Sequence, residues 1–155
     1  MIFLHGLESS GQAYKASVIR KSYPELITPD FTGPFEARMD SLYPILGEEK
    51  DWAIIGSSFG GLMGAIFTCD HPDQVRKLLL LAPALMLPEF ASYPSREPVS
   101  VPTAIIHGRQ DAIVPLELVR EIAQKVFSNL TYHIVDDDHH LHKAADTLDW
   151  KTILA

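Results

Sequence analysis

The sequence predicts an α/β protein in which a mainly parallel sheet of about six strands lies between two layers of helices. Short apolar segments alternate along the chain with longer segments that suit helices, and there are no repeats or low-complexity tracts. Because the short segments are apolar at most positions, they suit strands that are covered on both faces of a parallel sheet. With 155 residues and 46% hydrophobic side chains, the chain has the size and composition of one domain, residues 1–155.

The expected elements follow in order. Strands are predicted near 2–5, 25–28, 52–57, 77–82, 102–107 and 131–135, and helices near 11–22, 35–47, 59–70, 115–127 and 140–153. The first strand is a short apolar run, and the third is apolar and partly β-branched. The fifth strand is entered from Pro102 and closed by Gly108, and Pro115 is well placed to open the next helix. The last strand alternates apolar and polar residues.

Composition excludes several classes of protein. The net charge of −7 and a pI near 5.4 argue against binding to nucleic acid, which requires a basic face. No apolar run approaches the roughly 20 residues that span a bilayer, and the first expected strand begins too near Met1 to leave room for a signal peptide. The single cysteine, Cys69, cannot form an internal disulfide and is expected to be buried. We therefore expect a cytoplasmic protein without membrane contact, of undetermined oligomeric state.

Ser58 lies between glycines in the segment 56–60, at the hinge from an expected strand into an expected helix. A serine at such a hinge takes a strained backbone conformation that points its hydroxyl outward above the sheet. The small residues Gly60, Gly61, Gly64 and Ala65 would give the helix a face able to lie very close to the sheet. A Gly-x-Ser-x-Gly motif alone is common by chance, so its meaning depends on suitable partners elsewhere.

Suitable partners occur in loops that follow two later strands. Asp111 follows the strand near 102–107, and His139 and His140 follow the strand near 131–135. Loops at the carboxyl ends of parallel strands meet at one edge of the sheet, so a histidine there could contact both Ser58 and Asp111. An acid that orients a histidine, which in turn takes the serine proton, is the arrangement used for nucleophilic catalysis.

With these parts in place, nearly the whole chain resembles the α/β-hydrolase family, and most of all its small bacterial serine esterases. The resemblance depends on residues 3–7, 56–60 and 107–115 and on the late aspartate-histidine loop. It implies a serine hydrolase without a cofactor that acts on small carboxylic esters or thioesters. In the family, the backbone N–H groups that correspond to Leu7 and Phe59 form the oxyanion hole. His5 would then hold this loop by a hydrogen bond.

The identity of the base has alternatives. The family pattern of histidine, any residue, then an apolar residue favours His139, with His140 as the alternate, while His142 is expected to be solvent-facing in the last helix. The cluster 136–142 also contains aspartate and histidine side chains, which are common ligands of metal ions such as zinc or manganese. The loop is too short to aim them at one ion, and no H-E-x-x-H helix accompanies them, so no metal is expected. The three aspartates are instead expected to cap the last helix.

Two departures from the family bear on the substrate. No antiparallel strand pair precedes the first strand, and the segment 83–100 is too short for a lid of several helices. Its apolar side chains either line the pocket or merely cover the sheet: Leu85, Met86, Leu87, Phe90 and Tyr93. Phe31, Phe35 and Met39 are candidates for the other wall. The pocket should be open and suited to a small acyl ester or thioester substrate. A non-catalytic binding protein of the same fold, or an amidase or peptidase, is the alternative.

Overall fold

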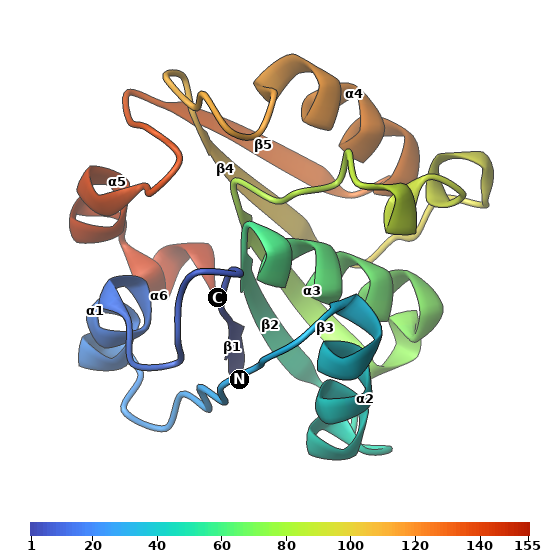
Figure 1. Ribbon diagram of the computed structural model, residues 1–155, viewed down its shortest axis with the longest axis horizontal. Coiled ribbons are helices and arrows are strands. Elements are labelled where there is room, and N and C mark those ends of the chain that lie inside the picture. Colours follow the sequence, from blue (N-terminus) through green and yellow to red (C-terminus); the bar gives the residue numbers. More distant parts are fainter.

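A five-stranded parallel sheet runs through the centre of the computed structural model, which describes residues 1–155 (Figure 1). Its strands are β1 (Ile2–Leu4), β2 (Trp52–Ser57), β3 (Val75–Leu81), β4 (Thr103–Gly108) and β5 (Leu130–Val135). They lie side by side in chain order, and every neighbouring pair is parallel. Because all carboxyl ends point the same way, the loops that follow the strands meet at one edge of the sheet.

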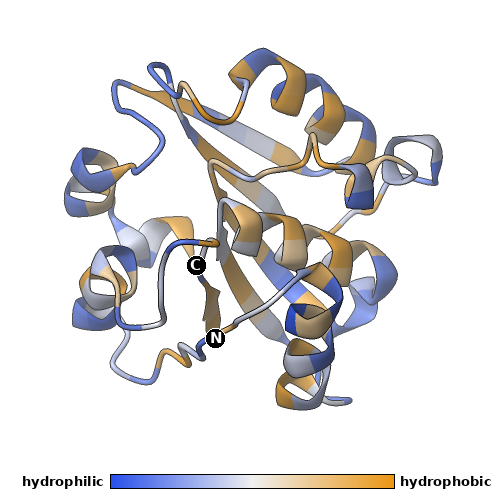
Figure 2. Cartoon of the chain, viewed as in Figure 1, coloured by the Kyte–Doolittle hydropathy of each residue, from blue (hydrophilic) through white to orange (hydrophobic).

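Helices cover both faces of the sheet. One face carries α1 (Tyr14–Ser22), α5 (His142–Thr147) and α6 (Trp150–Ile153), and the other carries α2 (Phe35–Leu46), α3 (Phe59–Asp70) and α4 (Leu116–Val126) (Figure 1). Successive strand residues point to opposite faces, so Ile54 packs in the α2–α3–α4 core and Ile55 in the α1–α5–α6 core. Hydrophobic residues gather on the strands and on α3 (Figure 2). The predicted three-layer α/β fold is confirmed.

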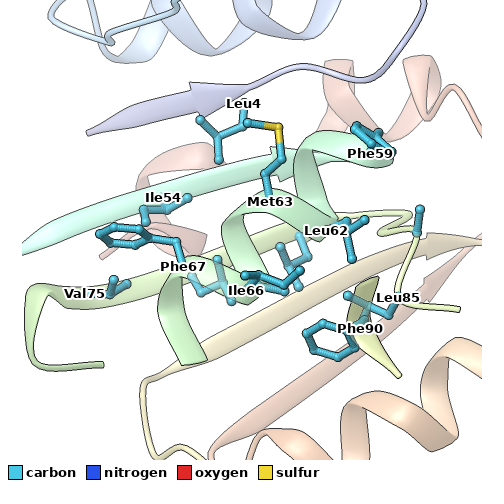
Figure 3. Close-up of a cluster of buried hydrophobic side chains, with 14 of the residues drawn as sticks. Leu4, Ile54, Phe59, Leu62, Met63, Ile66, Phe67, Val75, Leu85 and Phe90 are labelled. Atoms are coloured by element: carbon cyan, nitrogen blue, oxygen red, sulfur yellow. The ribbon is translucent and has the colours of Figure 1, made fainter. Parts of the chain in front are cut away.

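Helix α3 is the most deeply buried helix, with every residue from 59 to 68 inside the protein. Its side chain Met63 lies beside Leu4 and Phe67 lies beside Ile54, whereas Leu62 points toward Leu85 (Figure 3). A helix that is apolar all round belongs in the interior, because no face of it can be turned to water at low cost. The thiol-bearing Cys69 near its end is half-buried against this core.

The strand predicted at 25–28 is reduced to a single bridge, so the prediction of six strands is wrong by one. Ile27 bonds to β1 through two backbone hydrogen bonds, Phe3 N to Ile27 O (2.8 Å) and Ile27 N to Met1 O (3.1 Å). The next donor in a parallel ladder would be the amide of residue 29. That residue is Pro29, which has no N–H, and the ladder therefore stops.

The ends of two helices also differ from expectation. Helix α1 begins at Tyr14 rather than near residue 11, and the helix predicted over 140–153 is split into α5 and α6. Leu148 is extended between them (φ −67°, ψ 134°). Asp149 then starts a new helix, because its carboxylate accepts hydrogen bonds from the amides of Lys151 and Thr152.

The segment between β3 and β4 forms no lid. It contains only two short 3₁₀ turns, Pro88–Phe90 and Tyr93–Ser95, as its length predicts. Among the helices, none has the length and apolar character needed to cross a membrane.

Candidate active site

Ser58 connects β2 to α3 in the strained conformation that the motif predicts, with φ 54° and ψ −113°. Three backbone hydrogen bonds hold it there. Ser58 N donates to Leu81 O (2.9 Å), and Ser58 O accepts from the amides of Leu62 (3.1 Å) and Ala84 (3.0 Å). A positive φ in a residue with a side chain persists only where the surroundings impose it. The hydroxyl is thus carried on a rigid turn.

Glycines on both sides of Ser58 let β1, β2 and α3 approach each other closely. A side-chain carbon at Gly60 would collide with the carbonyl of Leu4, and one at Gly56 would lie 2.5 Å from Gly60 O. Neither backbone contact can be relieved by a side-chain rotation. The glycines therefore set how near the start of α3 lies to the end of β1.

The structure brings Ser58, His139 and Asp111 together from three separate loops. His139 Nε2 lies 3.0 Å from Ser58 Oγ, and His139 Nδ1 lies 2.8 Å from Asp111 Oδ2. His139 therefore bridges the hydroxyl and the carboxylate with its two ring nitrogens. The alternate base, His140, is exposed and contacts neither group; its ring centroid lies 6.0 Å from that of His139. His142 is exposed at the start of α5, as predicted.

Asp111 is held as a buried carboxylate with several donors. Its side chain is 0% exposed, and its Oδ1 accepts from the amides of Ile113 (2.9 Å) and Val114 (2.8 Å). Burial by itself would raise the pKa of Asp111. The amide hydrogen bonds and the contact with His139 outweigh burial and lower the pKa of Asp111 below its ordinary value. The group is thus an ionised partner for His139.

The loop after β1 lies directly beside Ser58. A side-chain carbon at Gly6 would be 3.5 Å from Ser58 Cβ, so the Gly6–Leu7 peptide is next to the hydroxyl. The Leu7 amide donates to no backbone or side-chain acceptor. Phe59 is the first residue of α3, and such amides have no partner within their own helix. The Leu7 and Phe59 amides thus belong to segments that border Ser58, and neither has an acceptor within the protein.

His5 fixes the conformation of this loop. Its buried ring accepts a hydrogen bond from Phe31 N at Nε2 (2.8 Å), so Nδ1 carries the proton and donates to Gly6 O (2.7 Å). Gly6 O and Leu7 N belong to the same peptide group. His5 therefore orients the peptide that carries the Leu7 N–H.

A cleft of about 480 Å³ opens on Ser58 and His139. It lies between the loop after β1, the start of α1 and the His139 loop, and its lining is Phe3, Gly6, Leu7, Glu8, Ser9, Ala13, Tyr14, Lys15, Ser57, Ser58, Ile113, His139, His140 and His142. Leu7 and Ile113 are well exposed at its mouth. The cleft is thus lined by more polar than apolar residues, and several of them were not among the residues that the sequence predicted.

Of the two roles that the sequence left open for the segment 83–100, the structure favours coverage of the sheet, and the candidates for the other wall do not line the cleft either. Leu85, Phe90 and Tyr93, like Phe31 and Met39, are buried in the core and line no part of the cleft. The segment packs down onto the end of α3 because Tyr93 Oη donates to Asp70 (2.9 Å). The Arg96 guanidinium lies over the Tyr93 ring and also bonds to Asp70. These contacts leave no side chain of the segment to face Ser58.

Helix α1 contributes residues to the site that the sequence did not indicate. Lys15 Nζ donates to His140 O (2.7 Å), and burial lowers the pKa of Lys15. Tyr14 Oη donates to Asp146 of α5, and its ring packs on His142. These contacts connect α1 to the loop that carries His139. Nothing in the pattern of the helix signals them, because the partners are more than a hundred residues away.

Arg38 of α2 is a second residue that the sequence did not indicate. It is buried, its Nε donates to Gly33 O (3.0 Å) and one NH2 group lies 3.5 Å from Leu7 O. Its guanidinium also lies over the Phe59 ring, 5.4 Å from the centroid. Arg38 thus contacts both Leu7 and Phe59.

The acidic cluster before His139 has structural roles. Asp137 accepts from the amide of Ala144 in the first turn of α5 (2.8 Å), whereas Asp138 accepts from His140 N and Asp136 pairs with Lys143. Only one of the three aspartates caps the helix, so that prediction is wrong for the other two. No group of three or more histidine, cysteine or carboxylate side chains is arranged to hold a metal ion.

The chain is similar to one known protein family and to solved structures of the same fold. The family model described as Phospholipase/Carboxylesterase matches residues 36–149. No curated protein matches the chain by sequence. Among solved structures, alpha/beta hydrolase domain-containing protein 10 from mouse is similar, with a TM-score of 0.76 and 20% identity over 98% of this chain and 86% of that one.

Two further solved structures have the same fold. Est1E from Butyrivibrio proteoclasticus, with ferulic acid bound, has a TM-score of 0.74 and 16% identity over 94% of this chain and 85% of that one. The monoacylglycerol lipase of Paleococcus ferrophilus has a TM-score of 0.71 and 14% identity, covering 99% and 93% of the two chains. At such identities the likeness concerns the fold.

Proposed function

Since this chain belongs to the phospholipase/carboxylesterase family of α/β hydrolases, we propose that it is a serine hydrolase of small carboxylic esters or thioesters. One observation carries the proposal: His139 is within hydrogen-bond distance of both Ser58 Oγ and Asp111 Oδ2. Ser58 is the nucleophile, His139 the general base and Asp111 the group that orients His139. The same residues lie in the order serine, acid, histidine along the chain.

The reaction proceeds in two acyl transfers. Ser58 Oγ attacks the carbonyl carbon while its proton passes to His139 Nε2, and the buried Asp111 carboxylate stabilises the imidazolium that forms. His139 then gives this proton to the leaving alcohol or thiol as its bond to carbon breaks. Water repeats the sequence on the acyl-enzyme, with its proton taken by His139, and releases the carboxylic acid and free Ser58.

The amides of Leu7 and Phe59 act as the oxyanion hole. Negative charge develops on the carbonyl oxygen in each tetrahedral intermediate, and two fixed N–H donors stabilise it there. Loss of one such donor costs roughly 3 kcal/mol of barrier in enzymes where it has been measured. The position of Gly6 against Ser58, and the hold of His5 on the Gly6–Leu7 peptide, support this role.

The cleft supports a small substrate. Its volume of about 480 Å³ fits a small ester, and the absence of a lid leaves it open to water. The bound ferulic acid of Est1E and the lipase activity named for the Paleococcus protein are consistent with ester substrates on this fold. We propose that the preferred substrates are esters or thioesters with a short acyl group.

Active-site labelling with a fluorophosphonate tests the proposal. We expect the wild type to label at one serine and to hydrolyse p-nitrophenyl acetate, and Ser58→Ala to lose both while remaining folded. Ser41→Ala is the matched control, because Ser41 lies on α2 and bonds only to its own helix at Ala37 O. An unreactive wild type would instead support a non-catalytic binding protein. Activity undiminished in Ser58→Ala would reject the assigned nucleophile.

A further inference from the structure

His107 is a buried imidazole that the proposed mechanism does not use. It lies in β4, four residues before Asp111, and its side chain is 0% exposed. Its Nε2 is 3.2 Å from Asp111 Oδ2 and 3.1 Å from Val114 O. Its Nδ1 is 2.7 Å from the hydroxyl oxygen of Tyr132 in β5. The ring thus connects the proposed catalytic acid to a side chain of the neighbouring strand.

The partners of His107 determine its tautomer. Nε2 faces a carboxylate and a carbonyl oxygen, neither of which carries a proton, so Nε2 must be the donor. Burial lowers the pKa of His107, so the ring is neutral and Nδ1 is unprotonated. Nδ1 therefore accepts a hydrogen bond from Tyr132, whose own pKa is raised by burial so that it keeps its hydroxyl proton.

Two histidines therefore lie against Asp111 Oδ2. His139 Nδ1 hydrogen-bonds to it from the side of Ser58 at 2.8 Å, and His107 Nε2, which donates to Val114 O, lies 3.2 Å from it in the interior. The other oxygen is occupied by the amides of Ile113 and Val114. The polar Nε2–H group of His107 beside this oxygen favours negative charge on the inner side of the carboxylate, away from the bond to His139.

We propose that His107 and Tyr132 are positioning residues, which form a relay behind Asp111 that aims its carboxylate at His139 and limits its basicity. Tyr132 donates to His107, and the Nε2–H group of His107 lies against both Val114 O and Asp111 Oδ2. Tyr132 holds the His107 ring in place, and His107 sets how strongly Asp111 binds the proton of His139. The proposal rests on the proposed function, because its effect is on the proposed triad.

Other charged or titratable groups lie near this relay and could also affect the pH profile. His140 precedes α5 beside His139, and Lys15 of α1 bonds to its carbonyl. Glu117 of α4 raises the pKa of Tyr132, and Arg120 of α4 lowers it. Because none of these side chains hydrogen-bonds to Asp111, variants at 107 and 132 address the relay alone.

The first measurement is the pH dependence of kcat/KM for p-nitrophenyl acetate, from about pH 5 to about pH 9. In His107→Leu the carboxylate loses the neighbouring Nε2–H group and stabilises protonated His139 more strongly. We therefore expect the midpoint of the profile to move up by about half to one pH unit and kcat to fall roughly tenfold, with KM little changed.

Two conservative variants separate positioning from packing. In His107→Gln the amide nitrogen can reach the position of Nε2, so we expect most of the rate and the wild-type midpoint to be retained. Tyr132→Phe removes only the hydroxyl, and we expect a smaller upward shift of the midpoint than in His107→Leu. If kcat falls equally in His107→Gln and His107→Leu, and the midpoints of both pH profiles match that of the wild type, then His107 acts only through packing. That result would overturn the proposal. A folded His107→Leu with the wild-type profile would do the same.

Nitrogen NMR of the wild-type imidazoles supplies a readout that needs no turnover and no variant. The relay requires His107 to be protonated at Nε2 and unprotonated at Nδ1. Observation of the opposite tautomer would overturn the proposal even if His107→Leu does not fold. Absence of fluorophosphonate labelling in the wild type would reject the proposed function instead. The NMR tautomer, and the effect of Tyr132→Phe on the titration of the imidazoles, would still report on the relay.

Discussion

Ser58 shows how a single residue is held in a conformation that it would not adopt alone. Its φ of 54° is imposed by hydrogen bonds to Leu81, Leu62 and Ala84, which lie in or beside β3 and α3. These contacts offset a backbone strain of about 1–3 kcal/mol. The hydroxyl is thereby aimed at His139 before any substrate binds, which reduces the reorganisation needed in the reaction.

At the same scale, His139 and His140 can be distinguished as the base. We expect His139→Gln to lower kcat/KM for p-nitrophenyl acetate by roughly 10³-fold or more, because no other group is placed to take the Ser58 proton. His140→Gln is the matched variant on the adjacent residue and should cause a far smaller loss. The larger loss in His140→Gln would reverse the assignment.

Asp111 makes stability depend on pH. Its pKa in the folded protein lies below the ordinary value of 3.8, so on acidification the unfolded chain takes up the proton first. The stabilisation is therefore present above that value and is lost as the pH falls from it toward the folded pKa. We expect the wild type to lose more free energy of unfolding than Asp111→Asn between about pH 5 and about pH 3. Urea titrations at each pH measure this, and parallel losses would contradict it.

At the scale of elements, the close contact of α3 with β1 determines the position of Ser58 relative to the Leu7 amide. Gly60 lies against the carbonyl of Leu4, whereas Gly64, one turn further along, faces only the ends of side chains. The start of the helix is therefore fixed by backbone against backbone. The later turns are held by apolar packing of Leu62, Ile66 and Phe67 (Figure 3).

Two alanine substitutions in this helix should have very different effects. Gly60→Ala must push α3 away from β1, and we expect a loss of at least about 2–3 kcal/mol in the free energy of unfolding, or no folding. Gly64→Ala meets Ile54 Cγ2 at 3.1 Å, a side-chain contact that needs a shift of only a few tenths of an ångström, and gains helix propensity of about 1 kcal/mol. Chemical denaturation compares the two. Similar losses would show that the contact with Leu4 does not limit the packing.

At the scale of the molecule, the arrangement of layers places the cleft. The segment between β3 and β4 packs onto α3, so the open side of Ser58 faces α1 and the His139 loop. Helix α1 therefore forms one wall of the cleft through Tyr14 and Lys15. A lid that would enclose a long lipid chain is absent from this side.

The open cleft predicts a preference for short acyl chains. We expect kcat/KM across p-nitrophenyl esters to be highest for acyl groups of about two to four carbons. It should fall by roughly an order of magnitude or more for chains of about ten carbons, whose outer part would stay in water. Acyl-CoA thioesters and aminoacyl anilides in the same assay compare the bond types. A rate that rises steadily with chain length would contradict this account of the cleft.

The sequence alone predicted the alternation of strands and helices, the strained turn at Ser58 and the loops that carry Asp111 and His139. These features follow from local patterns: apolar runs, glycines at a hinge and proline at a helix start. It misjudged the strand at 25–28 because the ladder stops at Pro29, whose missing N–H matters only once β1 is alongside.

Only the tertiary structure decided which side chains meet. The contacts of Lys15 with His140, of Arg38 with Leu7 and of Tyr132 with His107 join residues that are up to 125 positions apart, and no periodicity encodes them. The role of the apolar side chains in the segment 83–100 stayed open for the same reason, since an apolar side chain serves equally well in a core or a pocket until its neighbours are known. Local pattern thus determined the elements and the reactive groups, and the packing of distant elements determined the cleft and its surroundings.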